Sequence, residues 1–378
     1  MENVADGRQE SGPVRVGLVG VGKMGLSHLS IIRALSGVRV VGVVESFGYL
    51  ADVLSKYTAV PTYGDLDSML AQVTPDALVL ATPSASHYDM VRAALERGIH
   101  VFCEKPLTLS SAQSADLAQR AAQAGLVTQV GYHYRYTATF AEVKHLMDDE
   151  TIGPVSHTLA QAYGPVVLRE AGSTWRTKRT AGGGCLYDYA AHPLDLLQWY
   201  FGAAERASGS ILQSIFSAET DDAVYSTLHF GASNAQLSVN WSDESQRKMT
   251  TKISMWGEHG NLYADRQELQ LYLRPTATPP AGYQHGWNIR YITDLAEPVE
   301  FYLRGEEYSA QLRAFVDAVT ARDPHAVRST FASAAQTDRM IDMVLADSQG
   351  KPPPDGTVGP IPGGSAPPAR RRRKWGRR

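Results

Sequence analysis

Short apolar runs alternate with helical patterns over the first third of the chain. The apolar runs are Val14–Val19, Val38–Val44, Asp76–Ala81, Ile99–Cys103 and Val127–Val130. Helical patterns separate them at Lys23–Leu35, Ser86–Glu96 and Ser111–Ala124. Runs that are almost continuously apolar are typical of parallel strands whose sheet is covered on both faces. The pattern therefore predicts βαβ units and a doubly wound, Rossmann-type α/β domain over residues 14–131.

The pattern changes after Gly131. A helical stretch at Phe140–Met147 precedes strand-like runs, several of them alternating, at Val155–Tyr163, Ala207–Phe216, Ala223–Phe230, Ala235–Trp241, Thr250–Trp256 and Leu269–Leu273. Helical patterns return at Tyr308–Thr320 and Thr330–Leu345. Successive alternating strands joined by turn residues favour antiparallel pairing. We therefore expect a second α/β domain over residues 132–347, with a large and mostly antiparallel sheet.

The two ends of the chain differ from the rest in composition. Residues 1–13 are a polar lead, and residues 348–378 are rich in Pro and Gly before they become basic, so we predict disorder at both ends. Residues 351–378 carry eight Lys or Arg and one Asp, a net charge of +7. Because the whole chain has a net charge of −3, residues 1–350 have a net charge of −10. This balance argues against a nucleic-acid partner for the folded body. The tail is either a solvated end, which we favour, or a docking segment for a polyanion.

The composition is that of a globular protein, with 43% hydrophobic and 20% charged residues. No apolar run is long enough for a bilayer, and the start lacks the apolar stretch of a secretory leader, so we expect a cytoplasmic protein without membrane contact. Cys103 and Cys185 can form no disulfide framework and lack the spacing of metal ligands. We therefore predict no metal site.

A glycine-rich loop follows the first predicted strand. Gly20, Gly22 and Gly25 fit the pattern G-x-G-x-x-G, with Lys23 and Met24 between the last two. The first glycine of such a loop permits a tight turn, the second lets backbone approach a pyrophosphate, and the third allows close helix packing. The start of the following helix would offer its N–H groups to the phosphates. This loop predicts a nicotinamide dinucleotide as the cofactor.

Glu45 ends the second predicted strand, 20 residues after Gly25. A carboxylate at this place accepts hydrogen bonds from the adenosine ribose hydroxyls and repels a 2′-phosphate. The next four residues contain no Arg that would offset that repulsion. We therefore favour NAD over NADP as the cofactor.

Two further loops follow predicted parallel strands, where ligands of such sheets bind. Thr82, Pro83 and His87 belong to the first loop, which either contacts the cofactor ribose or caps the next helix through a serine. Glu104 and Lys105 precede Pro106 in the second loop, and we expect both to contact the cofactor. Proline restrains the preceding residue, and a lysine held there could stabilise negative charge on a substrate oxygen.

Asp188 and His192 follow three consecutive glycines and open a helical pattern. A spacing of four places both side chains on one helix face, where the histidine could accept a proton and the carboxylate could orient it or anchor the substrate. A capped helix start with a half-buried histidine is one alternative. A metal pair is another, although no third ligand is marked by spacing. Asp195 is close enough in sequence to serve in either role.

These motifs occur in an order that resembles the glucose–fructose oxidoreductase / inositol dehydrogenase (Gfo/Idh/MocA) family. The resemblance spans roughly residues 14–347, and its most specific part is E-K-P followed by D-x-x-x-H. It implies a Rossmann domain, an α/β domain whose open sheet often packs against another subunit, and hence a homodimer or homotetramer. It also implies catalytic roles for Lys105, Asp188 and His192. Substrate contacts are implied for Tyr132, Arg135, Trp175 and Arg176, with His133 less typical at its position.

The resemblance implies oxidation of a secondary alcohol on a sugar, cyclitol or nucleotide-sugar. In that scheme His192 takes the hydroxyl proton, Lys105 steadies the oxygen and Asp188 holds the substrate. The basic group Arg176, Lys178 and Arg179 would suit an anionic substrate if it reached the pocket. Alternatives are an NADPH-dependent ketosugar reductase, a glycosidase that retains its NAD, and a dinucleotide sensor without catalysis.

Overall fold

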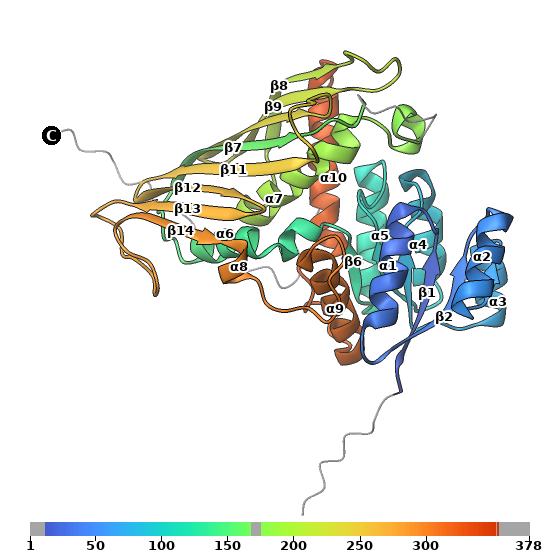
Figure 1. The fold of residues 1–378 in the computed structure, drawn as a ribbon. Helices are drawn as coiled ribbons and strands as arrows, with labels where there is room; N and C mark the ends of the chain where they lie inside the picture. The colour runs from blue at the N-terminus through green and yellow to red at the C-terminus, as the bar shows by residue number, and fades with distance from the viewer. Residues whose placement is uncertain (1–11, 168–174, 353, 355–378) are drawn as a thin grey trace, which may run out of the picture.

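The computed structural model describes residues 12–167, 175–352 and 354, which form two sheets with their helices. Figure 1 shows the two sheets side by side, with the first at the N-terminal end of the colour scale. The predictions of disorder for residues 1–13 and for the basic tail fall largely outside the described residues. No helix among the described residues is both long and apolar enough to cross a bilayer.

The first sheet has six strands in the order β3-β2-β1-β4-β5-β6, and all of its pairs are parallel. Its strands are β1 (Val14–Val19), β2 (Val38–Val44), β3 (Thr62–Tyr63), β4 (Ala77–Leu80), β5 (His100–Cys103) and β6 (Thr128–Val130). Its helices are α1 (Lys23–Ala34), α2 (Gly48–Thr58), α3 (Leu66–Gln72), α4 (His87–Leu95) and α5 (Ser111–Ala124). The strand order reverses between β1 and β4, which is where doubly wound sheets bind ligands. The predicted fold class is confirmed.

The second sheet has eight strands in the order β14-β13-β12-β11-β7-β10-β9-β8. They are β7 (Val155–Tyr163), β8 (Arg206–Gln213), β9 (Ala223–Phe230), β10 (Ser233–Asn240), β11 (Thr250–Gly257), β12 (Gly260–Asp265), β13 (Glu268–Leu273) and β14 (Gly286–Tyr291). Only β7 and β10 pair in parallel, so the prediction of a mostly antiparallel sheet is confirmed.

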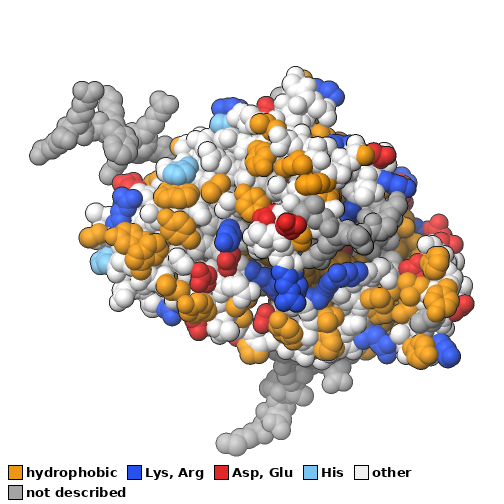
Figure 2. Space-filling view, turned by 45° about the horizontal axis from the view of Figure 1, so that its top comes forward, with side chains coloured by type: hydrophobic (Ala, Val, Ile, Leu, Met, Phe, Trp, Pro, Cys, Tyr) orange, Lys and Arg blue, Asp and Glu red, His pale blue; other side chains and the backbone are white. Residues whose placement is uncertain are grey.

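The two faces of the second sheet differ. Helices α6 (Ala138–Asp148), α7 (Ala191–Phe201) and α10 (Phe331–Ser348) lie under one face (Figure 1). The alternating leucines of β13 are fully buried. Large apolar side chains such as Ile211, Trp287 and Ile289 are exposed instead. Figure 2 shows hydrophobic side chains spread over the left of the molecule, where Figure 1 places this sheet.

The last helices return to the first sheet and hold the two halves together. Helix α9 (Glu306–Ala321) contributes Phe315 to the hydrophobic core around β1, and the short α8 (Ile292–Leu295) precedes it. Ser329 accepts a hydrogen bond from Val130 N and donates one to Val130 O, each 2.8 Å long. Because Val130 ends β6, these contacts fix the edge of the first sheet against the C-terminal part of the chain.

Candidate active site

The glycine-rich loop between β1 and α1 is shaped by contacts that only glycine permits. Gly20 has φ +87°, and a Cβ there would lie 2.8 Å from the carbonyl oxygen of Ala81. A Cβ on Gly25 would lie 1.9 Å from the carbonyl oxygen of Gly20. A Cβ on Gly22 would meet no protein atom within 4 Å. Two glycines therefore serve close packing, and the third leaves open space beside the helix.

That open space lies at the start of α1, where Gly22 is the N-cap residue and no side chain caps the helix. Uncapped N–H groups and the positive end of a helix attract phosphate. Lys23 and Met24 form the first turn and are at least partly accessible. The loop therefore fits the pyrophosphate of a dinucleotide.

Glu45 lies directly beside this loop, at the end of β2. Its carboxylate accepts hydrogen bonds from Val21 N at 3.0 Å and from Phe47 N at 2.8 Å. The side chain is thus held against the backbone of the glycine loop, within the region where the adenosine ribose of a dinucleotide would lie.

Lys105 and Asp188, which are 83 residues apart in sequence, form an ion pair. Lys105 Nζ donates to the Asp188 carboxylate and to its main-chain oxygen, each at 2.7 Å. Arg176 Nε donates to the other carboxylate oxygen at 2.8 Å. Burial alone would raise the pKa of Asp188. The charges of Lys105 and Arg176 have the larger effect and lower this pKa to about 2. Asp188 is therefore ionised at neutral pH and holds both cations in place.

His192 is buried among three aromatic rings of the segment that follows β6. The ring centroids of Tyr132, His133 and Tyr134 lie 6.4, 4.9 and 5.1 Å from that of His192. Burial, and then the charges of Lys105 and His133, lower the pKa of His192 well below its usual value. The imidazole is therefore neutral at neutral pH, with one ring nitrogen unprotonated.

The turn that carries Asp188 is a π-helix, Leu186–Ala190, which continues directly into α7. A π-helical turn is wider than an α-helical one, so Asp188 and His192 do not have the regular α-helical offset that their spacing predicted. The buried Asp221 fixes the start of this turn, because its carboxylate accepts a hydrogen bond from Leu186 N at 2.7 Å. Its main-chain oxygen accepts a second one from Cys185 N at 2.8 Å.

Glu104, the residue before Lys105, contacts helix α1. Its carboxylate lies 2.7 Å from Nε2 of His28, a buried residue of α1. Burial alone would raise the pKa of Glu104. The hydrogen bond and charge of His28, together with the charge of Lys105, outweigh burial, so the pKa falls below its usual value. This contact ties the loop after β5 to the helix that follows the glycine loop.

His87 was predicted to contact the cofactor, but its side chain lies between two loops instead. Its ring is fully buried, with Nε2 3.0 Å from the carbonyl oxygen of Thr82 and Nδ1 3.0 Å from that of Pro106. His87 thus joins the loop after β4 to the loop after β5, with each ring nitrogen beside a main-chain oxygen. Thr82 and Pro83 remain accessible at the end of β4.

Arg135 also departs from its predicted role, because its guanidinium is buried in an ion pair with Asp195. The two residues form hydrogen bonds of 2.8 and 2.6 Å, and Gln198 and Arg328 supply further acceptors. The pair joins the segment after β6 to α7 and leaves the substrate contact of Arg135 without support. Trp175 carries the Arg176 guanidinium over its ring, 4.6 Å from the centroid.

Three residues near the site were not identified in the sequence. His28 binds Glu104, and Asp221 fixes the π-helical turn. Tyr308 stacks on His133, with ring centroids 4.6 Å apart. His28 lies three residues after Gly25, on the helix that the glycine motif had already located. Asp221 and Tyr308 are distant in sequence from the residues they contact, so no local pattern marks them.

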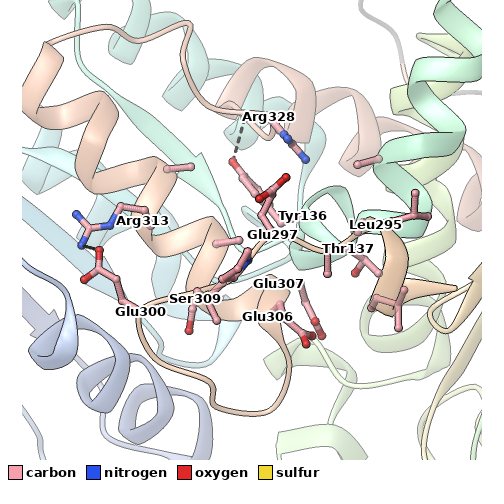
Figure 3. A pocket seen from close by; sticks show the side chains of 18 of the residues that line it. Tyr136, Thr137, Leu295, Glu297, Glu300, Glu306, Glu307, Ser309, Arg313 and Arg328 are labelled. Atoms are coloured by element: carbon pink, nitrogen blue, oxygen red, sulfur yellow. Dashed lines mark hydrogen bonds and ion pairs between the residues drawn. The ribbon is translucent and has the colours of Figure 1, made fainter. Parts of the chain in front are cut away.

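A cavity of about 600 Å³ lies apart from this cluster, between α6, α9 and the segment 296–300 (Figure 3). Its lining is rich in acidic side chains, including Glu297, Glu300 and Glu306, and lacks Lys105 and His192. Within the described part of the chain, no three His, Cys, Asp or Glu side chains gather as a metal ion would require.

Comparisons with known proteins agree with this geometry. The profile of an oxidoreductase family with an NAD-binding Rossmann fold matches residues 14–132, and the GFO/IDH/MocA C-terminal domain matches residues 140–263. D-glucoside 3-dehydrogenase of Escherichia coli is 29% identical over a segment that covers 51% of this chain and 55% of the relative's length. Myo-inositol 2-dehydrogenase of Thermotoga maritima is 24% identical over 83% of this chain and 90% of its own.

Among solved structures, levoglucosan dehydrogenase in complex with NADH and L-sorbose has the same fold. Its TM-score is 0.77 at 19% identity, over 89% of this chain and 97% of the other. The chain spans only about half to two thirds of the length of several curated relatives that it matches.

Proposed function

The chain belongs to the GFO/IDH/MocA oxidoreductase family, and we propose that it transfers a hydride between NAD and a secondary alcohol or ketone of a sugar or cyclitol. One observation carries the proposal: Lys105, which follows β5 of the first sheet, and Asp188, which precedes α7, meet in a largely buried ion pair beside a neutral His192. A sensor that only binds the dinucleotide would not need such an arrangement.

Each of the three side chains has a chemical role in this proposal. His192 is neutral at neutral pH, so an unprotonated ring nitrogen is present that can take the proton of a substrate hydroxyl as the carbon–hydrogen bond breaks. Lys105 keeps its ammonium beside the substrate oxygen and stabilises the negative charge that grows there. Asp188 holds that ammonium at 2.7 Å. The nicotinamide ring, when bound, supplies the hydride chemistry.

Gly22, Lys23 and Met24 would hold the cofactor's pyrophosphate, and Glu45 its adenosine ribose. The Glu45 carboxylate supports a preference for NAD, since a 2′-phosphate there would face a negative charge. Thr82 and Pro83 would line the same crevice.

The substrate class comes from the relatives, which are named as dehydrogenases of glucosides and inositols. Arg176 remains 42% exposed while it binds Asp188, so its guanidinium can also reach a polar substrate. The exposed apolar face of the second sheet supports a homodimer or homotetramer.

A panel of sugars, cyclitols and nucleotide-sugars, screened for NADH formation, tests the proposal. We expect at least one polyol to yield NADH, and NADP to support a slower reaction. Cleavage of an aryl glycoside without net NADH would favour the glycosidase instead. NADPH oxidation with a ketosugar, faster than the NAD reaction, would favour the reductase.

A further inference from the structure

A strap from the second half of the chain crosses helix α1. The strap consists of residues 296–305, between α8 and α9. In its middle, Glu300 accepts a hydrogen bond from Ser36 N at 2.9 Å, just beyond the end of α1. Near its end, Arg304 Nη1 lies 3.6 Å from Sδ of Met24, in the first turn of α1. The strap therefore brings a guanidinium to the helix end where a phosphate is expected.

The backbone of Arg304 is held in an uncommon conformation. Its φ is +67°, in the left-handed region that residues other than glycine seldom adopt. Its carbonyl oxygen accepts a hydrogen bond of 2.8 Å from Arg266, which in turn pairs with the buried Glu307 at 2.7 Å. Such conformations persist where the surroundings enforce them, and they cluster at functional sites.

The side chain of Arg304 lacks an anionic partner in the described part of the chain. Its hydrogen-bond acceptor is the thioether of Met24, which is a weak acceptor for a guanidinium. Gly22, two residues before Met24, has open space where a Cβ would stand. A cation, free helix N–H groups and open space thus meet at one place.

We propose that Arg304 binds the pyrophosphate of the dinucleotide, so that the second half of the chain contributes to the cofactor site. The inference rests on the proposed function, because it assumes that the glycine loop binds a dinucleotide. A guanidinium suits this role, since its planar fork of N–H groups matches phosphate oxygens. The bound cofactor would then be held by both halves at once.

The test is a fluorescence titration of NADH into the full chain and its Arg304→Ala variant, at low and high ionic strength. We expect the dissociation constant to rise roughly tenfold at low ionic strength. The difference should shrink at high ionic strength, because salt screens an exposed ion pair. ADP-ribose, which carries the pyrophosphate without the nicotinamide, should lose affinity by a similar factor when it competes with NADH.

Two further variants separate binding from folding. Arg304→Gly removes the guanidinium and suits the left-handed φ, so it should fold well and still bind NADH weakly. Arg322→Ala is the matched control, because Arg322 also has a positive φ of +54° but follows the end of α9. It should bind NADH like the wild type.

Three outcomes would overturn the inference. If both Arg304 variants bound NADH with wild-type affinity, Arg304 would have no role in binding the pyrophosphate. A loss that is equal at both ionic strengths, and that comes with a lower melting temperature, would assign Arg304 to contact between the halves only. If the wild type itself bound no NADH, the proposed function would fail together with the inference.

Discussion

The glycine loop and the Lys105–Asp188–His192 cluster are built in opposite ways. The loop spans six consecutive residues, and its shape depends on what a Cβ would touch within the first sheet. The cluster depends on side chains from the first sheet and from the start of α7, with an ion pair between residues 83 positions apart. The comparison indicates that a backbone site survives most side-chain changes, whereas a side-chain site depends on the packing of the whole molecule.

The largest expected effect concerns the cluster. His192→Ala removes the proposed proton acceptor, and a positioned base typically contributes about 10²- to 10⁴-fold in rate. We expect turnover to fall by roughly that factor, measured as the initial rate of NADH formation with a substrate from the panel. Wild-type turnover in this variant would remove His192 from the chemistry.

Gly25→Ala tests the claim that the loop is built from backbone contacts. The new Cβ would lie 1.9 Å from the carbonyl oxygen of Gly20, so α1 must shift away from the loop. We expect a loss of about 3 kcal/mol in the free energy of unfolding, measured with urea. Gly64→Ala is the matched control, since a Cβ there meets nothing within 4 Å. Equal stability of the two variants would contradict the packing role of Gly25.

Glu45→Ala tests the side chain on which the loop's cofactor preference depends. Removal of the carboxylate deletes the repulsion of a 2′-phosphate and the acceptor for the ribose hydroxyls. We expect the preference for NAD over NADP to fall on the order of tenfold, measured as the ratio of the two dissociation constants. An unchanged ratio would leave the preference to another residue.

The smallest effect concerns a buried carboxyl behind the Lys105 loop. Asp338 accepts hydrogen bonds from Ser114 Oγ at 2.6 Å and from Thr108 N at 3.3 Å. Burial, opposed by these hydrogen bonds, raises its pKa to about 7. Because this pKa lies above the unfolded value, the folded chain loses stability as pH rises towards and through 7.

Asp338→Asn should therefore raise the melting temperature more near pH 8 than near pH 5, by a few degrees at about pH 8. Differential scanning calorimetry at both values checks the sign. A larger gain at the lower pH would contradict the raised pKa of Asp338.

The first sheet followed closely from the sequence, because most of its strands are almost continuously apolar and its first turn carries glycine. The predicted runs Val14–Val19 and Val38–Val44 coincide with β1 and β2. The helices α2 and α3 were not identified in the sequence. The edge strand β14 was missed as well, since its apolar residues Trp287 and Ile289 are exposed and give no core signal.

The candidate site was predictable in its residue types and less so in its contacts. Lys105 and Asp188 were marked by local motifs, but their ion pair depends on how the first sheet packs against the start of α7. His87 and Arg135 matched family positions, yet both are buried in contacts that hold segments together. Sequence spacing cannot separate a ligand contact from such support, because both require a polar side chain at a fixed place.

The central claim is that the glycine loop binds the cofactor and that His192 serves the chemistry, and a titration of NADH into two variants tests it most directly. Gly22→Ala places a Cβ in the open space beside α1, whereas His192→Ala leaves the loop untouched. The account predicts that Gly22→Ala weakens NADH binding at least tenfold, a loss of about 1.4 kcal/mol or more, while His192→Ala binds like the wild type. Equal affinity in the two variants, or a greater loss in His192→Ala, would contradict it.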